Sequence, residues 1–139
     1  DYWKHDVEDN AYILLKDKKN RVAMLHSTAT EWQHKFRLEL TLDNCLIELS
    51  GILSGSKSYG NEEFRLINKV KRNKSNSKIN IKKRYIKDYS WKREVDEFAQ
   101  IISQNKRIEN GNSDQAYNVM NIIDKIYKAD RSWTVKNKN

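Results

Sequence analysis

The chain has no proline, one cysteine and four glycines among its 139 residues. Proline has no backbone N–H to donate to a neighbouring strand, so its absence means that no candidate strand is excluded on this ground. The single Cys45 excludes an internal disulfide and a zinc site built from several thiolates, and it fits a reducing compartment. No apolar run approaches the roughly 20 residues that span a bilayer, and no signal-peptide core is present. We therefore expect a cytoplasmic protein with no membrane partner.

The scarcity of glycine bears on cofactor binding. A nicotinamide cofactor needs a glycine-rich turn between a strand and a helix, where the backbone approaches the pyrophosphate. Gly51, Gly55 and Gly60 have the wrong spacing for such a turn, and no helical pattern follows them. The sequence therefore predicts that this chain binds no cofactor by itself, and a P-loop is excluded for the same reason.

The charge balance is strongly basic, with a net charge of +8, a pI near 9.5 and a mean hydropathy of -0.95. Such a balance is typical of nucleic-acid binding, but it also follows from a composition rich in Lys and Asn. The scattered placement of most charges favours the second interpretation. The one concentrated stretch runs from Lys69 to Arg84 and contains eight basic residues without an acidic one. It predicts either a phosphate-binding hairpin or the solvent-exposed face of an ordinary strand.

Alternating apolar and polar residues predict strands in the first two-thirds of the chain. Residues 8–16 and 21–30 are rich in apolar side chains and flank a polar turn. In residues 36–42 and 45–50 every second side chain is apolar, and Asp43 and Asn44 suit the turn between them. A loop rich in Ser and Gly follows at 51–60, and a further hairpin is expected between 64–70 and 79–85.

The last third of the chain has a helical period. Trp91, Val95, Phe98 and Ile102 form one apolar stripe, and residues 119–127 contain another. Ser113 is expected to cap the second helix, because its hydroxyl can accept a free N–H of the first turn.

Strands first and helices last predict an α+β fold. We expect an open, mostly antiparallel or mixed sheet of about six strands with two C-terminal helices packed on one face. Residues 1–139 would form one domain, with the sheet at 7–89, a two-helix cover at 90–132 and a polar tail at 133–139. Strands 11–15 and 46–49 have apolar residues on both sides, so the uncovered sheet face predicts a homodimer.

Trp32, His26 and His34 are the candidate substrate-pocket residues. An indole ring can stack on a sugar, imidazoles can hydrogen-bond its hydroxyl groups, and pocket residues commonly lie on loops at strand ends. The alternative is that His26 is an ordinary sheet residue and Trp32 a packing residue. A metal site that includes Glu31 is not expected, because nothing fixes the geometry of these side chains.

Several segments occur in a characteristic order. They are Val-Glu-Asp-Asn-Ala at 7–11, the segment from His26 to His34, Leu-Ser-Gly at 49–51, Ser-Tyr-Gly-Asn-Glu at 58–62, and the helices at 91–98 and 112–127. Together they resemble the C-terminal domain of the Gfo/Idh/MocA oxidoreductases. The resemblance implies an α+β domain whose open sheet dimerises and forms one wall of the substrate pocket. The enzymes of this family oxidise or reduce sugars and related polyols with a nicotinamide cofactor.

Two motifs of that family are absent from this chain. Neither Glu-Lys-Pro nor Gly-x-His-x-x-Asp, which contain the catalytic Lys and His, occurs in it. The resemblance therefore implies a fragment that is not catalytic alone, with NAD or NADP bound by an N-terminal Rossmann domain of the same polypeptide. No catalytic, cofactor-binding or metal-binding residue is assigned.

The leading hypothesis is the substrate-binding and dimerisation domain of an NAD(P)-dependent sugar or polyol oxidoreductase. The alternative is a stand-alone basic module that binds nucleic acid or a protein partner through the Lys69 to Arg84 hairpin. Nucleic acid is the less favoured partner, because no recognition module accompanies the basic residues.

Overall fold

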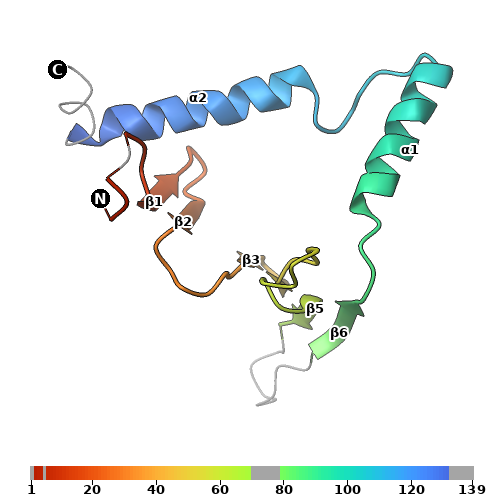
Figure 1. The fold of residues 1–139 in the computed structure, drawn as a ribbon, viewed down its shortest axis with the longest axis horizontal. Helices are drawn as coiled ribbons and strands as arrows, with labels where there is room; N and C mark the ends of the chain where they lie inside the picture. The colour runs from red at the N-terminus through yellow and green to blue at the C-terminus, as the bar shows by residue number, and fades with distance from the viewer. Residues whose placement is uncertain (1, 5, 70–78, 132–139) are drawn as a thin grey trace. The chain divides into compact units, whose positions relative to one another are not determined.

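The computed structural model describes residues 2–4, 6–69 and 79–131 (Figure 1). The chain divides into two compact units. The hairpin unit combines the N-terminal residues through Ala29 with the C-terminal residues from Glu94 onward, and the sheet unit is Thr30–Arg93. Each unit is described by itself, and the single domain over 1–139 stays a prediction. The expected polar tail lies outside the described residues.

Six strands precede two helices, which confirms the α+β class. The elements are β1 (Asn10–Lys16), β2 (Val22–Thr28), β3 (Arg37–Thr41), β4 (Cys45–Ser50), β5 (Glu62–Asn68), β6 (Ile79–Tyr85), α1 (Ser90–Ser103) and α2 (Ser113–Ala129). All described pairs are antiparallel, but they form a β1–β2 hairpin and a separate β3–β4–β5–β6 sheet in place of one sheet. Sequence alternation identifies strands without specifying which strands pair across the loop at 29–36, so this division was not predicted.

One face of the four-stranded sheet is apolar. Successive strands place hydrophobic residues directly opposite one another, so that one apolar row crosses all four strands. A second row crosses β3, β4 and β5 and ends at Lys83 of β6, which is paired with Phe64. This apolar sheet face consists of Leu38, Leu40, Ile47, Leu49, Phe64, Leu66 and Ile81. It is only partly covered, since Leu40 is 44% exposed and Ile81 is 50% exposed.

The opposite face of this sheet is charged. Glu48 bridges Arg37 at 3.4 Å and Arg65 at 3.7 Å, and Glu63 bridges Arg65 at 3.2 Å and Lys82 at 3.3 Å. These five side chains, here called the ion ladder, cross all four strands. The side chains of Glu48 and Glu63 are only 16% and 17% exposed. The sheet unit therefore has one face with an ordered row of ion pairs and one apolar face that is partly exposed.

Gly51 closes the end of β4 in a conformation that requires glycine. Its φ is +70°, and a Cβ placed on it would lie 2.1 Å from the carbonyl oxygen of Asn61. Its backbone N–H donates to the carbonyl of Phe36 at 3.0 Å. Gly51 thereby ties the loop before β3 to the loop after β4.

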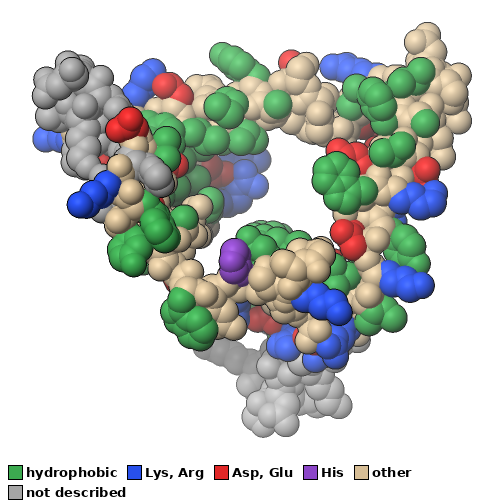
Figure 2. All heavy atoms as spheres, in the orientation of Figure 1, with side chains coloured by type: hydrophobic (Ala, Val, Ile, Leu, Met, Phe, Trp, Pro, Cys, Tyr) green, Lys and Arg blue, Asp and Glu red, His purple; other side chains and the backbone are tan. Residues whose placement is uncertain are grey.

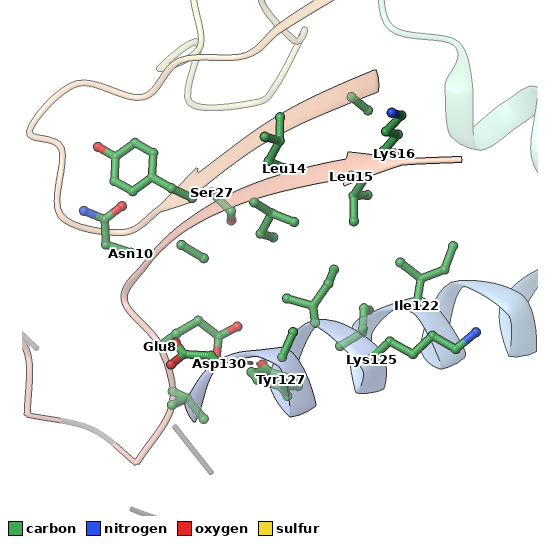
Figure 3. A pocket seen from close by; sticks show the side chains of 18 of the residues that line it. Glu8, Asn10, Leu14, Leu15, Lys16, Ser27, Ile122, Lys125, Tyr127 and Asp130 are labelled. Atoms are coloured by element: carbon green, nitrogen blue, oxygen red, sulfur yellow. Dashed lines mark hydrogen bonds between the residues drawn. The ribbon is translucent and has the colours of Figure 1, made fainter. Parts of the chain in front are cut away.

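The hairpin unit is built on the β1–β2 pair and α2. The predicted polar turn forms around Asp17, whose carboxylate accepts hydrogen bonds from the backbone of Lys19 and Arg21. In β1 the side chains alternate between half-buried and exposed. Leu15 points toward α2 and Leu14 points away from it (Figure 3). The hairpin therefore has an inner face and an outer face.

Both helices follow the strands in sequence, as predicted, although Ser113 is not the cap of α2. The cap is Asn112, whose side-chain oxygen accepts from the backbone N–H of Gln115 at 2.9 Å. The Gln115 side chain accepts in turn from the N–H of Gly111 at 2.7 Å, so both side chains satisfy free donors. The expected packing of the helices on a sheet face stays a prediction.

Hydrophobic side chains are visible at the surface over much of the described chain (Figure 2). Among the described residues no hydrophobic side chain is fully buried. No described helix is both long enough and apolar enough to cross a membrane.

Candidate functional site

Two loops meet at one end of the four-stranded sheet. The pairing of Arg37 with Ser50, and of Ser50 with Glu63, places the start of β3, the end of β4 and the start of β5 at the same end. The loops at 30–36 and 51–61 therefore neighbour each other, and the hydrogen bond from Gly51 to Phe36 joins them. Loops held on a sheet in this way are common positions for binding residues.

Two of the three predicted pocket residues lie on these loops. The ring of His34 contacts the ring of Tyr59 edge-on, with centroids 5.0 Å apart and planes at 71°. Trp32 is 93% exposed, so its indole faces are open to a ligand. Tyr59 was not predicted, although it stands in a segment that carries the family resemblance.

The loop at 51–61 adds a row of hydroxyl groups. The Oγ atoms of Ser54 and Ser56 are 3.2 Å apart, and those of Ser56 and Ser58 are 2.8 Å apart. A hydroxyl both donates and accepts, so this row can exchange hydrogen bonds with the hydroxyl groups of a sugar. We call Trp32, His34, Tyr59 and residues 54–58 the strand-end site.

The third predicted residue, His26, belongs to the hairpin unit and is not part of the strand-end site. It lies within β2, opposite Tyr12 of β1. The two rings stack with centroids 4.1 Å apart and planes at 8°. The Nε2 atom of His26 is 2.9 Å from Oδ1 of Asn10. Asn10 and Tyr12 were not predicted as neighbours of His26, because their proximity depends on the hairpin register.

The ion ladder sets the electrostatics of the sheet unit. Hydrogen bonds from Lys82 and then from Arg65 hold the pKa of the Glu63 carboxyl below its ordinary value. The ladder alternates acidic and basic groups across the strands, so opposite charges neutralise each other locally. The Nε atom of Arg65 is the one buried side-chain polar atom without a hydrogen-bond partner among the described residues.

A groove of about 1550 Å³ separates the inner face of the hairpin from α2 (Figure 3). At one end the Tyr127 hydroxyl donates to the carboxylate of Glu8 at 2.7 Å, and this carboxylate raises the pKa of Tyr127. The groove is larger than the roughly 300–1000 Å³ of typical small-ligand sites. We therefore assign no metabolite to it.

The glycine-containing loop does not fit a nicotinamide cofactor. It joins β4 to β5 of an antiparallel sheet, whereas a pyrophosphate cradle lies between a strand and a helix. Gly51 is also closed off by the Asn61 carbonyl. For metals, the described part of the chain contains no group of three His, Cys, Asp or Glu side chains with ligand geometry.

The basic stretch from Lys69 to Arg84 is described only at its ends, because residues 70–78 lie outside the described residues. Three of its described lysines already have partners. The Lys69 ammonium donates to the backbone carbonyl of Asp43 at 3.2 Å. Lys82 bridges Glu63, and the ammonium of Lys83 lies 4.8 Å from the centre of the Tyr85 ring. These contacts fit strand positions of an ordinary sheet.

Neither the family models, the curated proteins nor the solved structures contain a match to this chain.

Proposed function

We propose that this chain is the substrate-binding and dimerisation domain of a cytoplasmic NAD(P)-dependent oxidoreductase that acts on sugars or polyols. The proposal joins the ordered segments that resemble the Gfo/Idh/MocA C-terminal domain to the α+β fold with its open antiparallel sheet. The observation that carries it is the strand-end site. There an exposed indole, an imidazole and a row of hydroxyl groups lie on loops anchored by Gly51.

In this proposal the strand-end site binds the sugar and orients it. The face of Trp32 stacks on the C–H face of the ring, and His34 and the serine hydroxyls bond its hydroxyl groups. NAD or NADP supplies the hydride chemistry from a Rossmann domain in the same polypeptide. We assign no catalytic residue to this chain, and we derive no step through the cofactor.

The apolar sheet face is proposed to be the dimer interface. Its hydrophobic residues form a continuous surface across four strands and are partly exposed. A second copy that covers this face would remove that surface from water. Leu40→Lys should convert a dimer into a monomer, as measured by light scattering during gel filtration. Thr41→Lys, one residue further along β3 and on the opposite face, is the matched control and should remain dimeric.

The substrate assignment is tested on the complete reading frame that contains this chain. Oxidation and reduction of a panel of sugars and polyols would be followed through NAD(P)H fluorescence. Trp32→Ala should raise KM at least about tenfold with a smaller change in kcat, because stacking is lost in the ground state as well as in the transition state. Trp91→Ala removes an exposed tryptophan from α1 and should leave KM unchanged.

Two results would contradict the proposal. One is the absence of activity on every sugar and polyol of the panel. The other is an equal change of KM in Trp32→Ala and Trp91→Ala. Tight binding of NADH by the isolated chain would contradict the division of labour between the two domains.

A further inference from the structure

We infer that Asn10, Tyr12 and His26 form a second sugar-binding surface, the hairpin patch, on the outer face of β1–β2. The inference rests on the proposed function only for the class of ligand. The hairpin patch lies in the hairpin unit, whereas the strand-end site lies in the sheet unit.

The hairpin register assembles this patch. Tyr12 is paired directly with His26, so the two side chains lie on the same face and their rings stack at 4.1 Å. Asn10 is two residues before Tyr12 on that face, and its Oδ1 is 2.9 Å from Nε2 of His26. Figure 3 shows Asn10 at the start of β1, among the residues that line the groove beside α2. The stack and the hydrogen bond hold three planar side chains in fixed relative positions.

The hydrogen bond also determines which polar atoms are left for a ligand. When Oδ1 of Asn10 accepts from Nε2–H of His26, Nδ1 of the neutral imidazole is an acceptor. The amide group of Asn10 keeps two donors, and the Tyr12 hydroxyl can donate or accept. Among the described residues these three groups have no other side-chain partner. Tyr12 is 75% exposed, so its ring is open to contact as well.

This combination fits a neutral, polyhydroxylated ligand. A sugar offers neighbouring hydroxyl groups, each a donor and an acceptor, together with a C–H face that packs on an aromatic ring. Donors and acceptors alternate over the hairpin patch, and none of its three side chains is a carboxylate or a permanent cation. A phosphate or a carboxylate would call for fixed charge, which Arg and Lys provide elsewhere in proteins.

The experiment is a titration of the isotope-labelled chain with glucose and with myo-inositol, followed by NMR. The side-chain amide of Asn10, the imidazole of His26 and the backbone of 10–12 should shift together with one dissociation constant. His26→Phe keeps an aromatic ring opposite Tyr12 but removes the nitrogen atoms, and it should weaken binding about tenfold, as for one lost hydrogen bond. His34→Phe removes a histidine from the strand-end site and should leave the affinity at the hairpin patch unchanged.

Several outcomes would overturn the inference. NMR shifts confined to the strand-end site would overturn it, and so would equal losses of sugar affinity in His26→Phe and His34→Phe. A third such outcome is a lower melting temperature of His26→Phe with unchanged sugar affinity. A fourth is binding of adenosine while neither glucose nor myo-inositol binds. The first of these would leave the proposed function standing. Conversely, sugar could bind at the hairpin patch while the protein encoded by the complete reading frame is inactive. That result would contradict the proposed function and leave this inference intact.

Discussion

The sheet unit and the hairpin unit are stabilised in different ways. In the sheet unit, β4 and β5 are half-buried along their whole length or nearly so, and the ion ladder covers one of their faces. In the hairpin unit, β2 is exposed over almost all its length and β1 is half-buried only at alternate residues. The sheet unit has internal strands, whereas both strands of the hairpin unit are edges.

This difference shows how much depends on strand number. A two-stranded hairpin is at best marginally stable in water, and it gains stability when further strands or a helix pack against it. The stability of the hairpin unit therefore depends on a few hydrogen bonds that join it to neighbouring segments. Asp9 accepts from the backbone N–H groups of Tyr2 and Trp3, and Tyr127 donates to Glu8.

The sharpest test of the comparison is at Gly51 in the sheet unit. Gly51→Ala should lower the free energy of unfolding by about 2–4 kcal/mol, because the new Cβ meets a backbone carbonyl and φ is positive. Gly55→Ala is the matched control. No atom lies within 4 Å of its Cβ position and its φ is not positive, so it should be neutral or slightly stabilising.

Hydrogen exchange would measure both glycine variants residue by residue. Loss of protection confined to the sheet unit would show that the units unfold separately. Equal loss in both units would support the single domain expected from the sequence. Equal stability of the two variants would contradict the role given to Gly51.

The next largest effect is expected at the start of α2 in the hairpin unit. Asn112→Ala removes the side chain that accepts from Gln115 and should cost about 1 kcal/mol of helix stability. Ser113→Ala is the control, because that residue is the first of α2 and not its cap. Carbon chemical shifts of α2 would report fraying in the first variant alone. Fraying in the second would restore Ser113 as the cap.

A smaller effect is expected from the contact between Tyr127 and Glu8. Tyr127→Phe should lower stability by about 0.5–1 kcal/mol at neutral pH, since one hydrogen bond is lost. The pKa of Tyr127 is raised in the folded chain, so its contribution is present below the ordinary pKa of 10.0 and is lost as pH rises through the raised value.

Denaturant unfolding at neutral and alkaline pH would measure this dependence on Tyr127. The wild-type chain should lose more stability than Tyr127→Phe as the pH rises. Tyr117→Phe, on the exposed side of the same helix, should behave like the wild type. Identical alkaline curves for the wild type and Tyr127→Phe would refute the contact.

The smallest effect is expected from the ion ladder at acid pH. The pKa of Glu63 is lowered, so its contribution is present above the ordinary value of 4.5 and is lost as pH falls through the lowered pKa. Glu63→Gln should flatten this acid dependence of sheet-unit melting, and Glu97→Gln on α1 should not. A carboxyl titration of Glu63 at its ordinary pKa, followed by NMR, would contradict the ladder.

Local structure was largely predictable from the sequence, and tertiary grouping was not. The alternation at 36–42 and 45–50 led directly to β3 and β4, because a strand with one apolar face has a period of two. The ion ladder depends on which residues pair across strands, and single-strand patterns do not contain that register. Arg65 and Glu48, for example, are far apart in sequence and meet only through the β4–β5 pairing.

The candidate sites show the same limit. The sequence points to Trp32 and His34 because an indole and an imidazole between two strands are suited to sugar binding. His26 was identified for the same reason, but the structure places it in another unit with Asn10 and Tyr12 as partners. Tyr59 could have been found from its position at the far end of the serine-rich loop.

The two units also differ in the order in which their segments are synthesised. The sheet unit is one continuous stretch whose strands pair in the order in which they are made, so it can fold while the C-terminal helices are still unsynthesised. The hairpin unit combines segments that precede and follow the sheet unit, so α2 emerges only after all four strands of the sheet unit. The β1–β2 hairpin therefore has no α2 to pack against until the whole sheet unit has been synthesised.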